Sequence, residues 1–196
     1  MGIIERKLRN RENIRNTILT AALEIVKKEG WHSLSMRKIA QIIEYTVPVI
    51  YEYFASKDAL LNELTKTGFK RLAAVLQKAR ILEDQPGQKL KKMWTAYWDF
   101  AFAQSEFYQL MFGIDTHCCQ EKVILDDDEN PSKMFLSVLA EIQGVDASDQ
   151  QVSSQYFAMW SAVHGLIAIN MVNPQNSEAF NMKVLENLIA GFTNYK

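Results

Sequence analysis

Residues 35–57 read SMRKIAQIIEYTVPVIYEYFASK, and this stretch decides how the rest of the chain is interpreted. Its first apolar residues have the spacing of one helix face: Met36, Ile39, Ala40 and Ile43. Ser35 is placed to accept a hydrogen bond from a free backbone N–H as an N-cap, and Thr46 is placed to do the same for a second helix. Pro48 suits that helix's first turn. Two short helices joined by a turn can place one helix in a DNA major groove.

The same residues resemble the helix-turn-helix of the TetR family of bacterial transcriptional regulators. The family pattern S/T-hydrophobic-R-x-I-A is matched by residues 35–40, and its small hydroxyl residue at the start of the second helix by Thr46. The closing pattern [IL]-Y-x-[HY]-F-x-[SN]-K-x-x-L is matched by residues 50–60. The turn departs from the family, which usually has Gly where this chain has Glu44. Either Glu44 bears the strain of a positive φ, or the turn has another shape.

Composition and charge agree with a DNA-binding part and an acidic remainder. The 196 residues carry a net charge of −1, but residues 1–80 hold 15 Lys and Arg against 8 Asp and Glu, whereas residues 81–196 hold 7 against 15. Such asymmetry indicates a nucleic-acid-facing half, and a chance partition of solvated charge is the alternative. No apolar run reaches the roughly 18 residues of a membrane helix, and the N-terminus lacks a signal peptide's apolar core. We therefore expect no membrane association and a cytoplasmic protein.

The helical periodicities predict an all-α fold of about nine helices, without strand-like alternation. The TetR resemblance implies that an N-terminal three-helix helix-turn-helix domain precedes a larger helical domain for ligand binding and dimerisation. The predicted domains are a flexible basic leader at 1–11, a DNA-binding domain at 12–72 with its motif at 35–54, and a helical domain at 73–196. The predicted helices outside the motif are 10–29, 57–82, 88–104, 105–113, 131–144, 148–171 and one beginning at 177.

Residues 114–130 are predicted to form a loop that carries two features with alternative readings. Cys118 and Cys119 are adjacent, which favours a reduced pair over a disulfide, and a redox sensor is the alternative. The acidic run at 126–129 has no EF-hand spacing, so we interpret it as solvated charge rather than a metal site.

The TetR resemblance assigns roles to residues of the predicted DNA-binding domain. It implies that Arg37, Tyr51 and Lys57 hold the DNA backbone, while residues 46–49 face the groove. The candidate DNA-binding residues are Ser35, Arg37, Thr46, Val47, Pro48, Val49, Tyr51, Tyr53 and Lys57. Because residues 47–49 carry no side-chain donor, base recognition there is apolar, for example against thymine methyls. Specificity then depends on Tyr53 or Glu52 and on DNA shape.

A second, shorter resemblance lies in the C-terminal half. Residues 160–165 match a W-x-x-x-H-G signature of one TetR subgroup, and residues 107–113 (FYQLMFG) are similar to the same subgroup. The candidate ligand-pocket residues are Trp94, Tyr97, Trp98, Phe102, Tyr108, Met111, Phe157, Trp160 and His164. Aromatic positions at helical spacing are also what a core requires, and His164 also suits a hydrogen-bonded core or interface position. The pocket reading predicts an apolar or aromatic effector.

The favoured function is a DNA-binding transcriptional regulator, a repressor released from a palindromic operator by a small molecule. The resemblance implies a homodimer through the last two helices. We find no hydroxyl–His–carboxylate spacing, phosphate loop or metal cluster, so we predict no enzyme activity, cofactor or metal. One alternative is a helical small-molecule-binding protein or enzyme whose helix-turn-helix no longer binds DNA. Another is a DNA-binding adaptor controlled by a protein.

Overall fold

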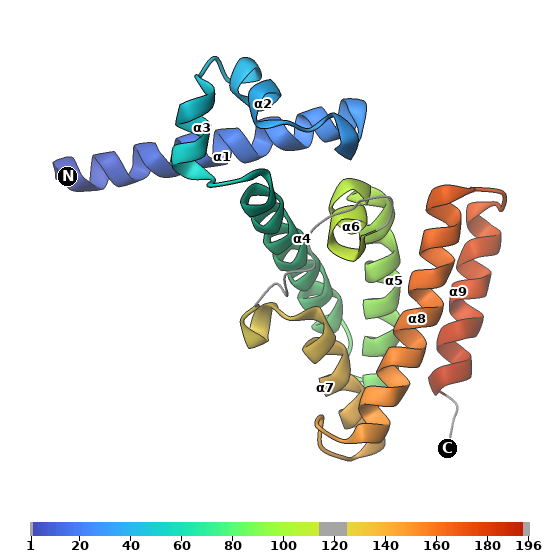
Figure 1. Ribbon diagram of the computed structural model, residues 1–196. Coiled ribbons are helices and arrows are strands. Elements are labelled where there is room, and N and C mark those ends of the chain that lie inside the picture. Colours follow the sequence, from blue (N-terminus) through green and yellow to red (C-terminus); the bar gives the residue numbers. More distant parts are fainter. Residues whose placement is uncertain (1, 114–124, 194–196) are drawn as a thin grey trace. The chain divides into compact units, whose positions relative to one another are not determined.

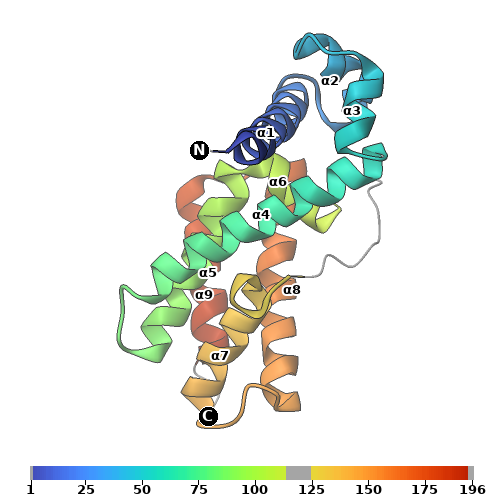
Figure 2. The same ribbon diagram turned by 90° about the vertical axis from the view of Figure 1, so that its left-hand side faces the viewer.

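The computed structural model describes residues 2–113 and 125–193, and these residues form helices, turns and loops but no strands (Figures 1 and 2). This confirms the predicted all-α fold of about nine helices. The α-helices are α1 Ile3–Glu29, α2 Met36–Ile42, α3 Val47–Tyr53, α4 Lys57–Arg80, α5 Pro86–Ala103, α6 Ser105–Phe112, α7 Pro131–Gln143, α8 Gln150–Val172 and α9 Glu178–Thr193. Two short 3₁₀ turns, η1 and η2, cover Trp31–Ser33 and Asp127–Glu129.

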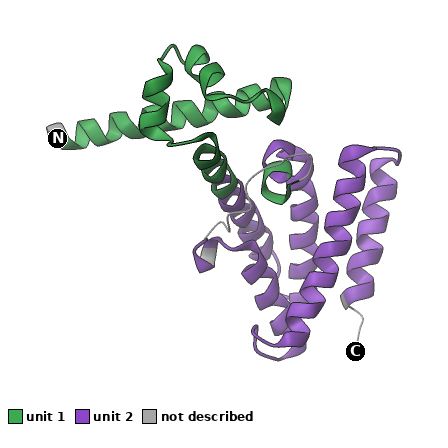
Figure 3. Cartoon of the chain, in the orientation of Figure 1, with its two compact units in different colours: residues 1–66, 109–123 green, residues 67–108, 124–196 purple. Residues whose placement is uncertain are grey.

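The chain divides into two compact units, coloured green and purple in Figure 3. Unit 1 comprises residues 1–66 and 109–123, and unit 2 comprises residues 67–108 and 124–196. The division falls inside α4, between Lys66 and Thr67. The predicted domain boundary after residue 72 lies in the same helix.

The first helix begins at the third residue, which corrects its predicted start at residue 10; the flexibility of the leader at 1–11 stays a prediction. α1 begins at Ile3, and the side chain of Glu5 accepts a hydrogen bond from the backbone N–H of Gly2 at 3.1 Å. An acidic residue in the first turn is also favoured by the helix dipole. The prediction was wrong because this first part of α1 carries charged side chains on its exposed faces and has no buried stripe to reveal its period.

The head, α1 to the start of α4, is built around one face of α1. Ile18, Ala22 and Ile25 of that face are buried, and α1 packs against α2, which packs against α3. The guanidinium of Arg15 lies 5.1 Å from the ring centre of Phe54, at the end of α3, and 2.9 Å from Glu63 of α4. Arg15 thus joins α1 to the end of α3 and to α4. Phe54 is buried, as expected of a core residue.

The turn between α2 and α3 has the hydrogen bonds of a common helix C-terminus, but with Glu44 at the position that is usually glycine. Glu44 has φ of 57°, the single positive φ among the non-glycine residues described. The N–H of Tyr45 donates to the carbonyl of Ala40 at 2.9 Å, and the N–H of Glu44 donates to that of Gln41 at 3.4 Å. These two bonds form a Schellman motif, which normally has glycine at the position of Glu44. The left-handed turn of the helix-turn-helix is therefore present, with its strain.

The body, unit 2, is a helical bundle in which α5 packs against α7, α8 and α9. α8 and α9 lie side by side, as both views show, and the side-chain amide of Gln155 joins them by donating to the carbonyl of Phe192 at 2.8 Å (Figures 1 and 2). α5 is buried over much of its length, and its Trp94 ring stacks on Phe135 of α7 with centres 4.1 Å apart.

We expect Glu44→Gly to raise the free energy of unfolding by about 1 kcal/mol, because glycine adopts a positive φ without a Cβ clash. Glu44→Ala is the matched control, since it removes the carboxylate but keeps the Cβ. Urea unfolding followed by circular dichroism measures both variants. A glycine variant no more stable than the alanine variant would show that the backbone of this turn is unstrained.

Candidate functional site

The first helix of the motif has one polar residue used for structure and one that faces solvent. The Ser35 hydroxyl accepts a hydrogen bond from the backbone N–H of Lys38 at 3.2 Å, which confirms the predicted N-cap of α2. Arg37, in the first turn of α2, is exposed. Lys38 forms an ion pair with Glu29 at the end of α1. Arg37 is therefore the cation of this turn that is placed to meet an external anion.

The second helix, α3, buries one face and exposes another. Ile50 is fully buried, whereas Thr46, Pro48 and Tyr51 are exposed. Val47 and Val49 are half-buried, so they present only part of their apolar surface outward. An exposed face with a hydroxyl, an apolar ring and a phenol can make both polar and methyl contacts with a ligand.

Thr46 does not have the structural role that the sequence suggested. It is the residue that precedes α3, but its side chain makes no capping hydrogen bond. The expectation of a Thr46 cap was therefore wrong. Pro48 lies in the first turn of α3 and needs no N–H partner, so the helix begins with one donor fewer to satisfy. The Thr46 hydroxyl is consequently not committed to holding α3.

The start of α4 lies directly after the motif. The Ser56 hydroxyl accepts a hydrogen bond from the N–H of Ala59 at 3.0 Å and so caps α4. Lys57, the first residue of α4, is exposed. The first turn of a helix carries backbone N–H groups without intrahelical partners, and these favour anions.

A polar hollow beside α3 involves residues that the sequence analysis missed. It has a volume of about 530 Å³ and is lined by Lys7, Asn10, Arg11, Glu52 and Tyr53. The Arg11 guanidinium lies 6.0 Å from the ring centre of Tyr53. The signal was in the sequence, because residues 7, 10 and 11 are three and four apart and share one face if the leader is helical. Treating residues 1–11 as flexible concealed it.

In the body, four of the candidate pocket residues form one chain of hydrogen bonds. Trp160 Nε1 donates to the Tyr97 hydroxyl at 3.1 Å, the Tyr97 and Tyr108 hydroxyls lie 3.1 Å apart, and the Tyr108 hydroxyl lies 2.7 Å from His164 Nδ1. The indole can only donate, which favours the order of donation Trp160, Tyr97, Tyr108, His164. In that order His164 Nδ1 accepts, so the imidazole is neutral.

The pKa shifts agree with this order. Burial, then the neighbouring Tyr108, raises the pKa of Tyr97 well above its usual value, and burial raises the pKa of Tyr108. Burial lowers the pKa of His164. The phenols and the imidazole are therefore uncharged at neutral pH, as a chain of neutral donors and acceptors requires.

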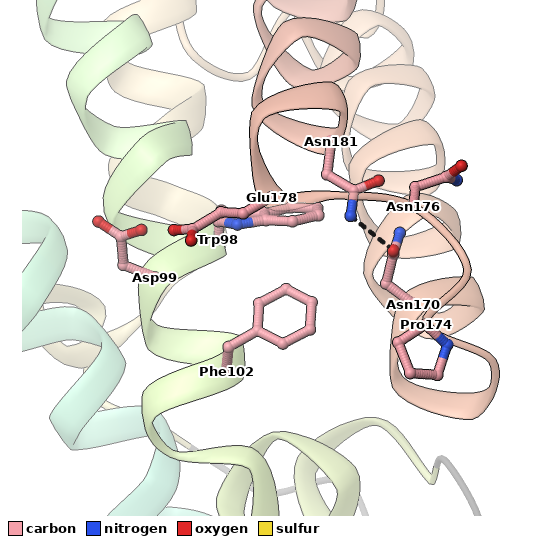
Figure 4. A pocket seen from close by; sticks show the side chains of 8 residues that line it. All are labelled: Trp98, Asp99, Phe102, Asn170, Pro174, Asn176, Glu178 and Asn181. Carbon is pink, nitrogen blue, oxygen red and sulfur yellow. Dashed lines mark hydrogen bonds between the residues drawn. The ribbon is translucent and has the colours of Figure 1, made fainter.

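The predicted pocket set is divided rather than gathered around one cavity. Trp94, Tyr97, Tyr108, Trp160 and His164 lie together, packed ring against ring. Trp98 and Phe102 instead line a separate hollow of about 430 Å³ with Asp99, Asn170, Pro174, Asn176, Glu178 and Asn181 (Figure 4). Phe157 is 63% exposed, and Met111 is half-buried in unit 1. An aromatic effector pocket therefore stays a prediction, and the polar residues of the hollow were missed because they lie on three elements.

Part of the predicted loop at 114–130 can be compared with the structure. Cys118 and Cys119 lie outside the described residues. In the acidic run, Asp127 forms an ion pair with Lys133, and Glu129 lies 3.0 Å from Lys70. Two of its carboxylates are thus paired with lysines of the body.

Known families match both parts of the chain. Residues 18–64 match the family model described as "Bacterial regulatory proteins, tetR family", and residues 90–191 match the model described as "Tetracyclin repressor-like, C-terminal domain". The chain belongs to the TetR family. The first match contains the whole of α2 and α3, and the second contains the hydrogen-bonded chain of the body. No helix among the described residues of this TetR-family protein is long and apolar enough to cross a membrane.

Similar proteins include both an activator and a repressor of transcription. The chain is 29% identical over 105 residues to the HTH-type transcriptional activator FasR of Mycolicibacterium smegmatis, covering 54% of this chain and 48% of that protein. It is 34% identical over 79 residues to the transcriptional repressor KstR of the same organism, covering 40% and 39%. The matched region thus spans half or less of each relative. A solved protein of unknown function from Rhodococcus sp. RHA1 shares the fold, with a TM-score of 0.75 and 22% identity over 91% of this chain and 93% of that one.

Mutation of the two hydroxyl residues of the motif is expected to change the free energy of unfolding by different amounts. Ser35→Ala removes a cap and should lower the free energy of unfolding by about 1 kcal/mol. Thr46→Ala removes no capping bond and should change it by less than about 0.5 kcal/mol. Urea unfolding of both variants measures the difference. An equal loss for the two would mean that Thr46 also holds its helix.

The stability of the body is expected to depend on the charge of His164. Burial lowers the pKa of His164 in the folded protein, so the neutral imidazole stabilises the fold. This contribution to the free energy of unfolding is fully present above about pH 6.5, the pKa of an unperturbed histidine, and is lost as the pH falls through the lowered pKa. Urea unfolding at pH 7.5 and 5.5 should show a smaller pH effect in His164→Gln than in the wild type. His32→Gln, an exposed histidine of η1, is the control and should keep the wild-type pH effect. Equal pH effects in the wild type and His164→Gln would exclude this role.

Proposed function

We propose that this TetR-family protein is a DNA-binding transcriptional regulator that acts as a homodimeric repressor. It binds a palindromic operator with two heads and leaves it when a small molecule binds the body. The observation that carries the proposal is the exposed face of α3, flanked by solvent-facing Arg37 of α2 and Lys57 of α4. A helix with an exposed face between two cations fits a major groove bordered by phosphates.

The contacts with DNA divide by chemistry. Arg37, Tyr51 and Lys57 hold phosphates, and Ser35 serves this surface indirectly by fixing the first turn of α2. Thr46, Pro48 and the exposed parts of Val47 and Val49 face base edges. Tyr53, which Arg11 approaches, completes the surface beside the polar hollow. Lys7 and Arg11, which line that hollow, add positive charge beside Tyr53 at the C-terminal end of α3.

Dimerisation through α8 and α9 is supported by their exposed apolar side chains. Ile169 and Val172 of α8 are 64% and 76% exposed, and Phe180 of α9 is 55% exposed. Phe157 of α8 adds a large aromatic side chain. Exposed apolar side chains on two adjacent helices are typical of an interface, and a two-fold pairing would bury them in a four-helix bundle.

Control by an effector follows from the two units sharing α4. A small molecule that binds the body more tightly in one arrangement than in another shifts the population of both units, because it must act through a difference in affinity. The operator then no longer fits both heads. We place the protein in the cytoplasm, with no enzymatic step of its own. The similar FasR is named an activator and KstR a repressor, so a reporter gene assay decides the sign.

The proposal predicts that single cations of the head contribute separately to DNA affinity. Against a 30-base-pair duplex, the slope of log K against log[salt] should become shallower by about 0.9 in Arg37→Ala and in Lys57→Ala, one phosphate contact each. Lys28→Ala, an exposed lysine in the last turn of α1, is the matched control and should keep the wild-type slope. Fluorescence anisotropy at four salt concentrations measures the slopes.

Failure of the wild type to bind any duplex at low salt would reject the proposal in favour of a small-molecule-binding protein whose helix-turn-helix is inactive. Unchanged slopes in both head variants, with binding intact, would place the DNA surface elsewhere.

A further inference from the structure

The hollow of about 430 Å³ in the body lies among α5, the end of α8 and the start of α9. Its volume is within the range of small-molecule sites. Figure 4 shows three kinds of side chain around it: the carboxylates of Asp99 and Glu178 on one side, the amides of Asn170 and Asn181 on the other, and the aromatic rings of Trp98 and Phe102 between them. Its residues come from separate elements and converge only in the folded body.

The acidic side carries charge that is not neutralised by the described residues. Neither Asp99 nor Glu178 belongs to any of the ion pairs found in the described part of the chain. Burial and then the charge of Glu178 raise the pKa of Asp99, so the two carboxylates repel one another. A positive group placed between them would relieve that repulsion.

The amide side has an acceptor in need of a donor. Asn170 Nδ2 donates to the carbonyl of Leu166 at 2.8 Å, and because a carbonyl only accepts, this fixes the orientation of the Asn170 amide. Its Oδ1 must then accept from Asn181 Nδ2, at 2.7 Å. Asn181 is only 6% exposed, and its Oδ1 has no hydrogen-bond partner among the described residues. A buried acceptor left unpaired is unfavourable. Because this oxygen is closed to solvent, a ligand gains its hydrogen bond only when the Asn181 amide turns toward the hollow.

The aromatic side offers an apolar surface with negative ring faces. The centres of the Trp98 and Phe102 rings lie 4.8 Å apart at an angle of 49°. Trp98 is nearly buried and Phe102 is 40% exposed. Rings of this kind attract both flat apolar groups and organic cations.

We propose that this hollow binds an amphipathic organic cation: an ammonium group at one end, an aromatic or apolar middle, and a hydrogen-bond donor at the other end. The ammonium meets Asp99 and Glu178, the middle lies on Trp98 and Phe102, and the donor end lies toward the amide pair of Asn170 and Asn181. This inference names a ligand class for the proposed regulator and rests on that function for its biological meaning. The test measures ligand binding in the absence of DNA. The proposed ligand class and the proposed DNA-binding function can therefore fail independently of one another.

The test uses four probes of one shape on the purified full-length protein, followed by isothermal titration calorimetry. Tyramine has the ammonium, the ring and a phenolic donor. Tyrosol replaces the ammonium by a neutral hydroxyl, 3-(4-hydroxyphenyl)propanoate replaces it by a carboxylate, and 2-phenylethylamine lacks the phenolic donor. We expect tyramine to bind about tenfold more tightly than tyrosol and about threefold more tightly than 2-phenylethylamine, and the carboxylate to bind most weakly.

The variant Asp99→Asn/Glu178→Gln keeps the shape of the hollow and should reduce the tyramine preference over tyrosol to less than about threefold. Glu83→Gln/Asp84→Asn is the matched control, because it removes the same charge before the start of α5, roughly 20 Å along the helix from Asp99, and should keep the preference. No saturable tyramine binding at millimolar concentration, or an equal preference in the Asp99/Glu178 variant and the wild type, would overturn the proposal. Thermal unfolding of both variants confirms that each is folded.

Discussion

One uninterrupted helix, α4, has to satisfy two separate cores. Its first half buries Leu60 and Leu64 in unit 1, and its second half buries Leu72 and Leu76 in unit 2. Because each backbone hydrogen bond of a helix depends on the turn before it, a rotation or shift of one half is carried along the same backbone to the other. The Ser56 cap fixes where the helix begins, directly after the helix-turn-helix. This shared helix is the covalent connection through which, in our proposal, a ligand bound to the body acts on the head.

Within the head, the side chains that stabilise the fold differ from those that face outward. Ser35 holds α2, Arg15 lies between Phe54 and Glu63, and the Schellman hydrogen bonds hold the turn at Glu44. Thr46, Arg37 and Lys57 have no such structural task in the contacts described, and they face outward. Because the turn's hydrogen bonds use backbone atoms only, the family's usual glycine can be replaced by Glu44 at the cost of strain, without altering the outward face.

The sequence predicted most of the helices because their ends carry chemical signals: Gly30 after α1, the Ser56 cap, Pro131 at the start of α7 and Gly144 at its end. It missed the start of α1, where exposed charged residues hide the period, and the Thr46 side chain, whose identity permits a cap but does not require one. It also treated the body's aromatics as one set. Periodicity places a residue on a face of its own helix but gives no information on which neighbouring helix that face meets. Tyr97 and Trp98 are adjacent in sequence, yet they point into different polar systems.

Those two polar systems of the body differ in a way that bears on ligand binding. In the first, every donated bond from Trp160 through Tyr97 and Tyr108 to His164 has an acceptor, so the chain stabilises one arrangement of α5, α6 and α8. A ligand must break these bonds before it can use the four groups, although the neighbouring Trp94 Nε1 has no hydrogen-bond partner among the described residues. In the second, the amide pair of Asn170 and Asn181 ends at an acceptor for which the described residues supply no donor, opposite two carboxylates that repel. In our proposal a ligand of the second system neutralises charge and supplies a donor, so the hollow beside Trp98 is the site we assign to an effector.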